Sequence, residues 1–223
     1  MPAIDHELQA LKGNLHDMLS MVKTQLEKCR QSIEERDPDL ASEVLNDEKK
    51  INVQELAIDR DCENILALHT PVATDLRLVL ATLKIANELE RIGDSAKSLA
   101  KVLAKDIKDA EYKWMDDLKF VEMLEVLVSM LKEMGNSLRK EDTKSALKSV
   151  KKDKVLNDYF KKALKTTTSL IKKNPDDAKT ILSLFLLIRN LERSGDLTKN
   201  IAEEIVFQIE ARVVKHKGVK KGR

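Results

Sequence analysis

The chain has 223 residues, of which 35% are charged and only 3% are aromatic, and it contains 6 Gly and 4 Pro. Its 40 basic and 38 acidic residues leave a formal net charge of +2. The chain as a whole therefore has too little positive charge to attract nucleic acid electrostatically. The longest largely apolar run covers residues 181–188, far short of the roughly 20 residues that a membrane-spanning helix needs.

Two cysteines, Cys29 and Cys62, lie at unrelated spacing. The first residues of the chain lack the apolar core of a secretion signal, so we expect both thiols to be reduced and buried in a cytoplasmic protein. Membrane association would then come only through partners. Residues 215–223 are strongly basic and are expected to form a solvated tail.

Apolar residues recur at helical spacing along almost the whole chain, and no segment reads convincingly as a strand. Gly13 falls inside the first helical pattern. Three breaks carry residues that favour a helix N-terminus, namely Asp37 before Pro38, Asp142 or Thr143, and Asn174 before Pro175. The pattern predicts six helices, at about 4–34, 38–68, 72–106, 114–139, 143–172 and 175–214.

A twelve-residue motif occurs twice, 102 positions apart, beginning at Leu89 and again at Leu191. Seven of its twelve positions are identical: Leu, Glu, Arg, Gly, Asp, Lys and Ala. Since the order and lengths of the helices repeat as well, we interpret the chain as a duplicated three-helix unit. We expect an all-α fold of two tandem antiparallel three-helix bundles, residues 1–108 and 109–214.

Each copy of the motif places a glycine, Gly93 or Gly195, inside a strongly helical stretch. Glycine there costs about 1 kcal/mol relative to alanine, so its repetition predicts that a ligand or another backbone comes close. Close approach of two helices without any ligand is the alternative. The motif arginines, Arg91 and Arg193, are interpreted as salt-bridge residues or as partner contacts.

Residues at heptad spacing between 78 and 103 predict a packing seam on the third helix, and adding 102 gives a similar seam on the sixth. Two acidic pairs with a spacing of four fall beside these seams. They are Glu90 with Asp94 and Glu192 with Asp196.

The second helix places four polar side chains on one face, at spacings of 4, 3 and 4: Glu48, Asn52, Glu55 and Asp59. In the fifth helix Asp153 and Asn157 match the first two, whereas Phe160 and Leu164 replace the others. Facing carboxylates repel one another, and a cation that binds oxygen ligands would relieve the repulsion. The alternative is that such acids face solvent or pair with Lys or Arg, as most isolated pairs do.

No catalytic arrangement is recognisable in the sequence. None of the four histidines has a glutamate three positions before it, as a ferritin-like di-iron site requires. The chain also has no Gly-rich phosphate loop, no metal-spaced Cys/His cluster and no nucleophile elbow. We therefore expect a protein that is not an enzyme.

The sequence resembles the PhoU family of phosphate-transport accessory proteins over essentially its whole length. The segments that carry the resemblance are Glu48–Asn52, Glu55–Asp59, Thr70–Arg77, Glu88–Asp94 and Leu191–Asp196. The second half departs from the family pattern at Ser194, where isoleucine is usual, and in the weaker polar face of its fifth helix.

The resemblance implies two three-helix bundles related by a pseudo-twofold. It implies a non-enzymatic regulator that bridges two partners, the high-affinity phosphate ABC transporter with its ATPase and the sensor histidine kinase of the phosphate regulon. The regulator inhibits both partners. It also implies multinuclear iron or zinc bound on Glu/Asp-x-x-x-Asp motifs. That motif is matched fully by Glu55/Asp59, Glu90/Asp94 and Glu192/Asp196, and in part by Glu48/Asn52 and Asp153/Asn157.

Two other functions stay open on the sequence alone. One is a metal-dependent hydrolase built on the same carboxylates, and the other is a helical scaffold without metal. The sequence does not decide between a monomer and a homodimer, or between a phosphate transporter and another transporter as the partner. A nucleic-acid partner is not expected.

Overall fold

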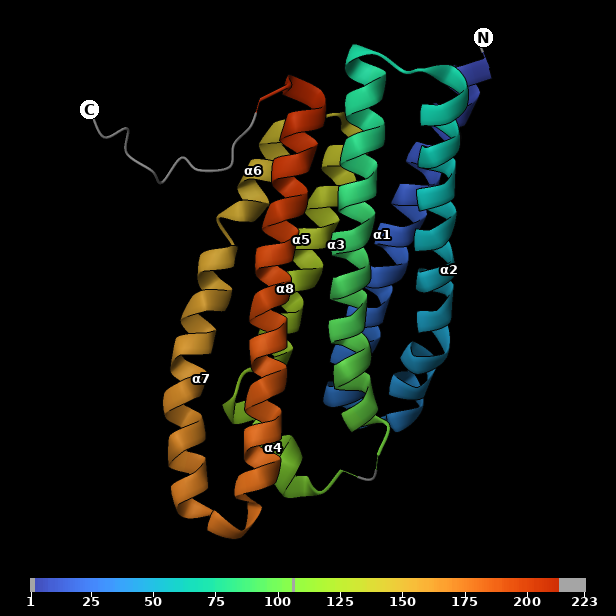
Figure 1. Ribbon diagram of the computed structural model, residues 1–223. Helices are drawn as coiled ribbons and strands as arrows, with labels where there is room; N and C mark the ends of the chain where they lie inside the picture. Colours follow the sequence, from blue (N-terminus) through green and yellow to red (C-terminus); the bar gives the residue numbers. More distant parts are fainter. Residues whose placement is uncertain (1–2, 106, 213–223) are drawn as a thin grey trace, which may run out of the picture.

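The computed structural model describes residues 3–105 and 107–212, and every regular element in this part of the chain is helical (Figure 1). The expected all-α class is therefore confirmed. The elements are α1 (Ala3–Glu35), α2 (Pro38–His69), α3 (Ala73–Leu103), α4 (Asp109–Asp117), α5 (Phe120–Lys140), α6 (Thr143–Val150), α7 (Asp153–Lys173), the 3₁₀ turn η1 (Pro175–Asp177) and α8 (Ala178–Glu210). The expected basic tail, 215–223, lies outside the described residues.

Six of these helices have 21 residues or more, but the predicted fourth and fifth helices are each divided. A single helix over 114–139 is wrong, because α4 and α5 are separated at Lys119, whose backbone is left-handed with φ 67°. A single helix over 143–172 is also wrong, because Lys151 and Lys152 form a turn between α6 and α7. Neither break contains Gly or Pro, so the sequence carries no local signal for them.

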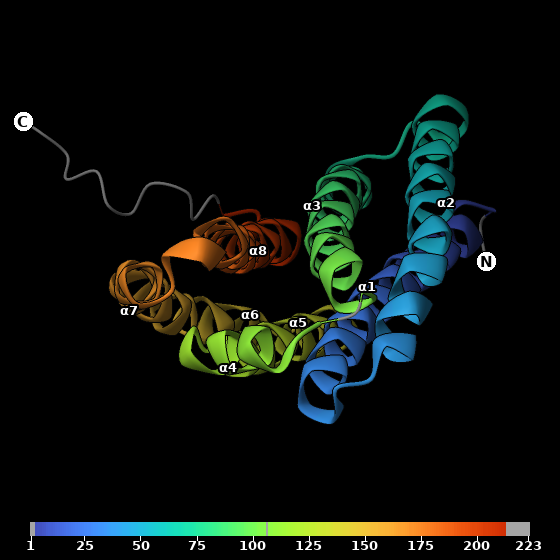
Figure 2. The ribbon, with the colours of Figure 1, turned by 90° about the horizontal axis from the view of Figure 1, so that it is seen from below.

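The first three helices pack on one another, and α5, α6, α7 and α8 form a second packed group (Figures 1 and 2). We call these groups the first and second halves. α3 lies along α8 and α1 lies along α5, so the halves meet along two pairs of helices (Figure 2). One continuous cluster of buried apolar residues runs through both halves. The two halves therefore share a core.

The predicted packing seams are buried in both halves, except for Thr180 at the start of the seam on α8, which is only partly buried. In α3 the buried seam residues are Leu78, Thr82, Ile85, Leu89, Ile92, Ala96, Leu99 and Leu103. In α8 they are Leu184, Leu187, Leu191, Ser194, Thr198, Ile201 and Ile205. The polar residues that form the candidate sites, such as Glu90 on α3 and Glu192 on α8, lie beside these buried seams and are only partly buried.

Two of the three predicted N-caps are confirmed. Oδ1 of Asp37 accepts a hydrogen bond from the backbone N–H of Asp39 at 2.8 Å, and Oδ1 of Asp142 accepts one from Lys144 at 3.0 Å. Asn174 makes no such bond. Its side-chain amide donates instead to a carbonyl of α7 at 3.0 Å, and α8 begins only after η1.

Both cysteines are buried free thiols, as expected. Burial raises the pKa of Cys29 and that of Cys62 to about 12, so both are neutral at physiological pH. Among the helices of the described residues, none combines the length and the apolarity that crossing a bilayer requires.

Candidate functional site

The polar faces of α2 and α3 form a first acidic cluster, which consists of Glu48, Asn52, Glu55, Asp59, Glu90 and Asp94. Residues three or four apart share one face of a helix, and α2 lies along α3, so the two rows face each other. Glu55 and Glu90 interact electrostatically across the two helices, and each also interacts with Asp94. The structure thus brings together the six residues that the sequence predicted for this half.

Glu48 anchors one end of the first acidic cluster. Its side chain is only 8% exposed, and its Oε1 accepts a hydrogen bond from Nζ of Lys97 at 2.6 Å and from Nδ2 of Asn52 at 2.8 Å. The ammonium of Lys97 favours the ionised carboxylate and holds the pKa of Glu48 below its ordinary value. Lys97 is therefore an internal cation of this cluster.

The other two glutamates of the cluster experience the opposite effect. Burial and then repulsion from Asp59 raise the pKa of Glu55, although Asn87 donates a hydrogen bond that opposes the shift. Burial and then repulsion from Asp94 and Glu55 raise the pKa of Glu90. Both carboxylates are thus destabilised when ionised, and positive charge between them would be favourable.

A second acidic cluster lies between α7 and α8 and consists of Asp153, Asn157, Glu192 and Asp196. Nδ2 of Asn157 donates to Oδ2 of Asp153 at 2.9 Å, while Oδ1 of Asp153 is buried without a hydrogen-bond partner. Burial and then the charge of Asp196 raise the pKa of Asp153 and that of Glu192. The four predicted residues of the second half are thus also brought together.

The second acidic cluster is shorter than the first because aromatic packing replaces one end. Phe160 stands where Glu55 stands in the first half, and its ring stacks on Phe185 of α8 with the ring centroids 5.5 Å apart. Leu164, which replaces Asp59, is exposed. The poorer donor set expected for this half is therefore explained by an apolar contact.

The two motif glycines are both buried beside the facing helix, but only one leaves no room for a side chain. A Cβ on Gly195 would overlap Cδ1 of Leu156 and lie 3.0 Å from Oδ1 of Asp153. A Cβ on Gly93 would meet its nearest neighbour, Oε1 of Gln25, at 3.4 Å, which is an ordinary contact. The close approach of the facing helix thus explains why position 195 is glycine. At position 93 the neighbouring side chains would leave room for a Cβ, so close approach does not require glycine there.

The donor chemistry of the two clusters suits a hard or borderline cation, because such ions bind carboxylate and amide oxygens. The partnerless Oδ1 of Asp153 is an acceptor that could serve in this way. Within residues 3–105 and 107–212, however, no three His, Cys, Asp or Glu side chains lie close enough together to hold one ion. Binding a metal would therefore require the carboxylates to move.

Four residues at the clusters were not predicted: Asn87, Lys97, Arg189 and Lys199. They form two pairs 102 positions apart, Asn87 with Arg189 and Lys97 with Lys199. The lysines even belong to the identical positions of the repeated motif. The motif's basic positions thus point to the two lysines, whereas Asn87 and Arg189 lie two positions before the motif begins.

The repeated arginines lie together at the junction of the halves. Arg91 and Arg193 both line a shallow groove of about 250 Å³ between α3 and α8. Nη1 of Arg91 lies 2.8 Å from Oε2 of Glu88, so Arg91 makes a salt bridge, one of the two roles expected for it.

Comparisons with known proteins match both halves of this structure. The PhoU domain matches residues 15–103 and 120–205. A phosphate-specific transport system accessory protein PhoU homolog from Borreliella burgdorferi is 32% identical to this chain. The match covers 90% of this chain and 92% of the homolog's length. A homolog of the same description from Pseudomonas putida is 29% identical, covering 96% of this chain and 84% of its own. The crystal structure of PhoU from Pseudomonas aeruginosa gives a TM-score of 0.84 at 27% identity, covering 93% of this chain and 99% of that one. The PhoU domain matches both halves, and the fold of a PhoU crystal structure is shared along nearly the whole length. The chain therefore belongs to the PhoU family.

Proposed function

We propose that the chain is an accessory regulator of phosphate uptake that acts by binding other proteins and not by catalysis. The observation that carries the proposal is the match of the PhoU domain to both halves, each of which has its own acidic cluster. Two relatives that match nine-tenths or more of the chain are described as accessory proteins of the phosphate-specific transport system.

In this proposal the partners are the ATPase of a high-affinity phosphate ABC transporter and the sensor histidine kinase of the phosphate regulon. The chain holds both inactive when phosphate is abundant, and it works in the cytoplasm with membrane contact only through these partners. Its halves, within residues 1–108 and 109–214, are repeats of one helical unit, although in the second half two of the three expected helices are each divided. Each half then presents one acidic cluster beside its packing seam.

The proposal includes iron or zinc bound by the two acidic clusters. It is supported by the raised pKa values of Glu55, Glu90, Asp153 and Glu192, because carboxylates that repel one another favour a cation. A bound cation would supply positive charge that joins α2 to α3 and α7 to α8. The first cluster has more carboxylates, so we expect it to bind the more tightly.

Affinity capture tests the choice of partners. The tagged chain from cells grown in excess phosphate is expected to retain the transporter ATPase or the sensor kinase. Deletion of its gene is expected to switch on a phosphate-regulon reporter in the same medium. Capture of neither protein, together with an unchanged reporter, would overturn the proposal. Light scattering on the same preparation distinguishes a monomer from a homodimer.

Elemental analysis of chain purified without a chelating resin tests the metal. We expect stoichiometric iron or zinc that is lost in the double variant Glu90→Gln, Asp94→Asn. The matched variant Glu125→Gln, at an exposed position of α5 outside both clusters, should keep its metal. A chain without stoichiometric metal would instead favour a plain helical scaffold, and a hydrolytic turnover abolished by Glu90→Ala would favour the hydrolase.

A further inference from the structure

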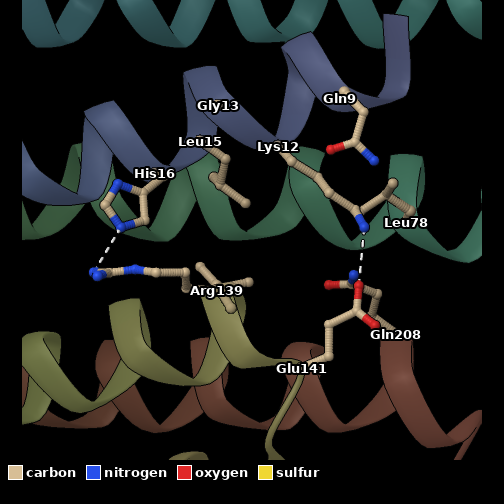
Figure 3. Close-up of a pocket in the computed structure, with 10 residues that line it drawn as sticks. Gln9, Lys12, Gly13, Leu15, His16, Leu78, Arg139, Glu141 and Gln208 are labelled. Atoms are coloured by element: carbon tan, nitrogen blue, oxygen red, sulfur yellow. Dashed lines mark hydrogen bonds and ion pairs between the residues drawn. The ribbon is translucent and has the colours of Figure 1, made fainter. Parts of the chain in front are cut away.

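A cavity of about 480 Å³ lies at the junction of the two halves (Figure 3). Its walls come from α1 and α3 of the first half and from α5 and α8 of the second. The volume falls in the range of small-molecule sites, roughly 300–1,000 Å³. No residue of either acidic cluster is among those that line it, so it is distinct from the sites described above.

One end of this cavity is basic. His16 of α1 and Arg139 of α5 point toward each other from opposite walls, with Nη2 of Arg139 3.2 Å from Nε2 of His16 (Figure 3). A guanidinium group presents several N–H donors in a fixed fork that matches the oxygens of a phosphate or a carboxylate. This end of the cavity is therefore suited to an anionic group.

An ion pair crosses the cavity further along, with Nζ of Lys12 2.9 Å from Oε1 of Glu141 (Figure 3). The two side chains are 37% and 59% exposed, so their pairing contributes at most about 1 kcal/mol and can exchange with another anion. Among the described residues that line the cavity, Glu141 is the one acidic side chain, against Lys12 and Arg139. The lining thus carries net positive charge.

The same ion pair also borders a second cavity of about 250 Å³. Asp5 and Asp75 line this smaller space, so an anion is repelled from it. The distribution of charge therefore directs an anionic group into the larger cavity, toward Arg139 and His16.

The remaining walls of the larger cavity offer surface for an organic molecule. Leu15 provides an apolar contact beside His16, and Leu78 provides one at the opposite end (Figure 3). The side-chain amides of Gln9 and Gln208 lie at the end away from His16, and amides both donate and accept hydrogen bonds (Figure 3). A ligand that fits must combine an anionic group, an apolar body and polar edges.

We propose that this cavity binds a small phosphorylated organic molecule, with its phosphate against Arg139 and His16 and its body against Leu15 and Leu78. A phosphate monoester carries about −1.5 to −2 charges at pH 7 and can use several cations, whereas a carboxylate needs only one. Because the walls belong to both halves, the bound molecule fastens the halves together and stabilises the folded chain. This inference goes beyond the proposed function and does not depend on it.

Calorimetric titration and thermal unfolding of the purified full chain test the inference with five probes: AMP, ribose 5-phosphate, adenosine, ribose and inorganic phosphate. We expect AMP or ribose 5-phosphate to bind and to raise Tm, and the uncharged probes to do neither. Inorganic phosphate should bind at least about tenfold more weakly, because it lacks the organic body. Equal binding by inorganic phosphate or by an uncharged probe, or no binding of either phosphorylated probe up to about 10 mM, would overturn the proposal.

Variants locate the binding. Arg139→Gln removes the guanidinium from the basic end and is expected to weaken binding of the phosphorylated probe by about tenfold or more. Arg60, an exposed arginine of α2 that lines neither cavity, provides the matched control Arg60→Gln, which should leave the affinity unchanged. Equal losses in both variants would mean unspecific charge attraction and would exclude this cavity. Circular dichroism verifies that both variants are folded.

Discussion

Nζ of Lys97 on α3 lies 2.6 Å from Oε1 of Glu48 on α2, inside the first acidic cluster. Lys199, at the same place in the second copy of the motif, acts in the same sense on Asp153 and favours its ionised form. Each half therefore carries an ammonium group that partly neutralises its acidic cluster. A metal ion at either cluster would compete with this built-in charge.

Replacing Lys97 by methionine leaves the buried carboxylate of Glu48 without its ion-pair partner. We expect the free energy of unfolding at pH 7 to fall by about 1–3 kcal/mol. Since the pKa of Glu48 is lowered in the folded chain, this contribution is fully present above the ordinary glutamate pKa, about 4.3. It is lost as the pH falls through the lowered value.

Urea unfolding of Lys97→Met at pH 7 and at acidic pH measures this effect. The difference from the unmodified chain should shrink on the acidic side. Lys162→Met, at an exposed position of α7, is the matched control and should change stability little at either pH. An equally large loss for Lys97→Met at both pH values would show that the ion pair is not the cause.

Replacing Glu90 by glutamine removes a carboxylate that its neighbours repel. The pKa of Glu90 is raised in the folded chain, so the native state binds more protons than the unfolded state and loses stability as the pH rises through this interval. We expect Glu90→Gln to raise stability near pH 7 by about 0.5 kcal/mol, the size of a like-charge pair four residues apart. The gain should vanish below the ordinary glutamate pKa.

Thermal unfolding with and without added Zn²⁺ extends this measurement. The cation should raise Tm of the unmodified chain more than that of Glu90→Gln, because the variant has lost a ligand. Glu125→Gln should respond like the unmodified chain. If Zn²⁺ shifts all three proteins equally, it binds somewhere other than the first acidic cluster.

The acidic clusters could be predicted from sequence because their geometry is local. Spacing of three and four residues fixes which side chains share a helix face, and the repeat identifies the matching helices. The breaks at Lys119 and at Lys151 could not be predicted in the same way, since no Gly or Pro marks them. Both short helices bury residues in the core, among them Trp114 of α4 and Ala146 of α6, and such tertiary contacts are not visible in local sequence.

Contacts between distant segments were likewise beyond the sequence pattern. The bond from Lys97 to Glu48 joins two helices, and His16 and Arg139 are 123 positions apart, so no periodicity relates the members of either pair. The stacking of Phe160 on Phe185 shows the same limit. The substitution of Phe160 for an acid was evident from the repeat, but its aromatic partner was not.

The two motif glycines should respond differently to the same substitution. Gly195→Ala places a methyl group against the buried Leu156, so overpacking of about 1–3 kcal/mol outweighs the helix gain of about 1 kcal/mol. Gly93→Ala meets only ordinary contacts and should be neutral or stabilising by up to about 1 kcal/mol. Thermal unfolding should place Gly195→Ala several degrees below Gly93→Ala. The reverse order would show that Leu156 adapts without cost.

Gly13 has neither of these reasons to be glycine. It lies inside α1 at an exposed position, and a Cβ there would have no atom of the rest of the protein within 4 Å. Gly13→Ala is therefore expected to raise the free energy of unfolding by about 0.5–1 kcal/mol, through helix propensity and a less flexible unfolded chain. The reciprocal change Ala10→Gly, three positions earlier on α1 and also exposed, should lower the free energy of unfolding by a similar amount.

Gly13 also lines the cavity at the junction of the halves. Weaker binding of AMP by a more stable Gly13→Ala chain would therefore show that the glycine serves the cavity. A chain that gains no stability would show instead that α1 requires glycine at this position for a reason other than its contacts.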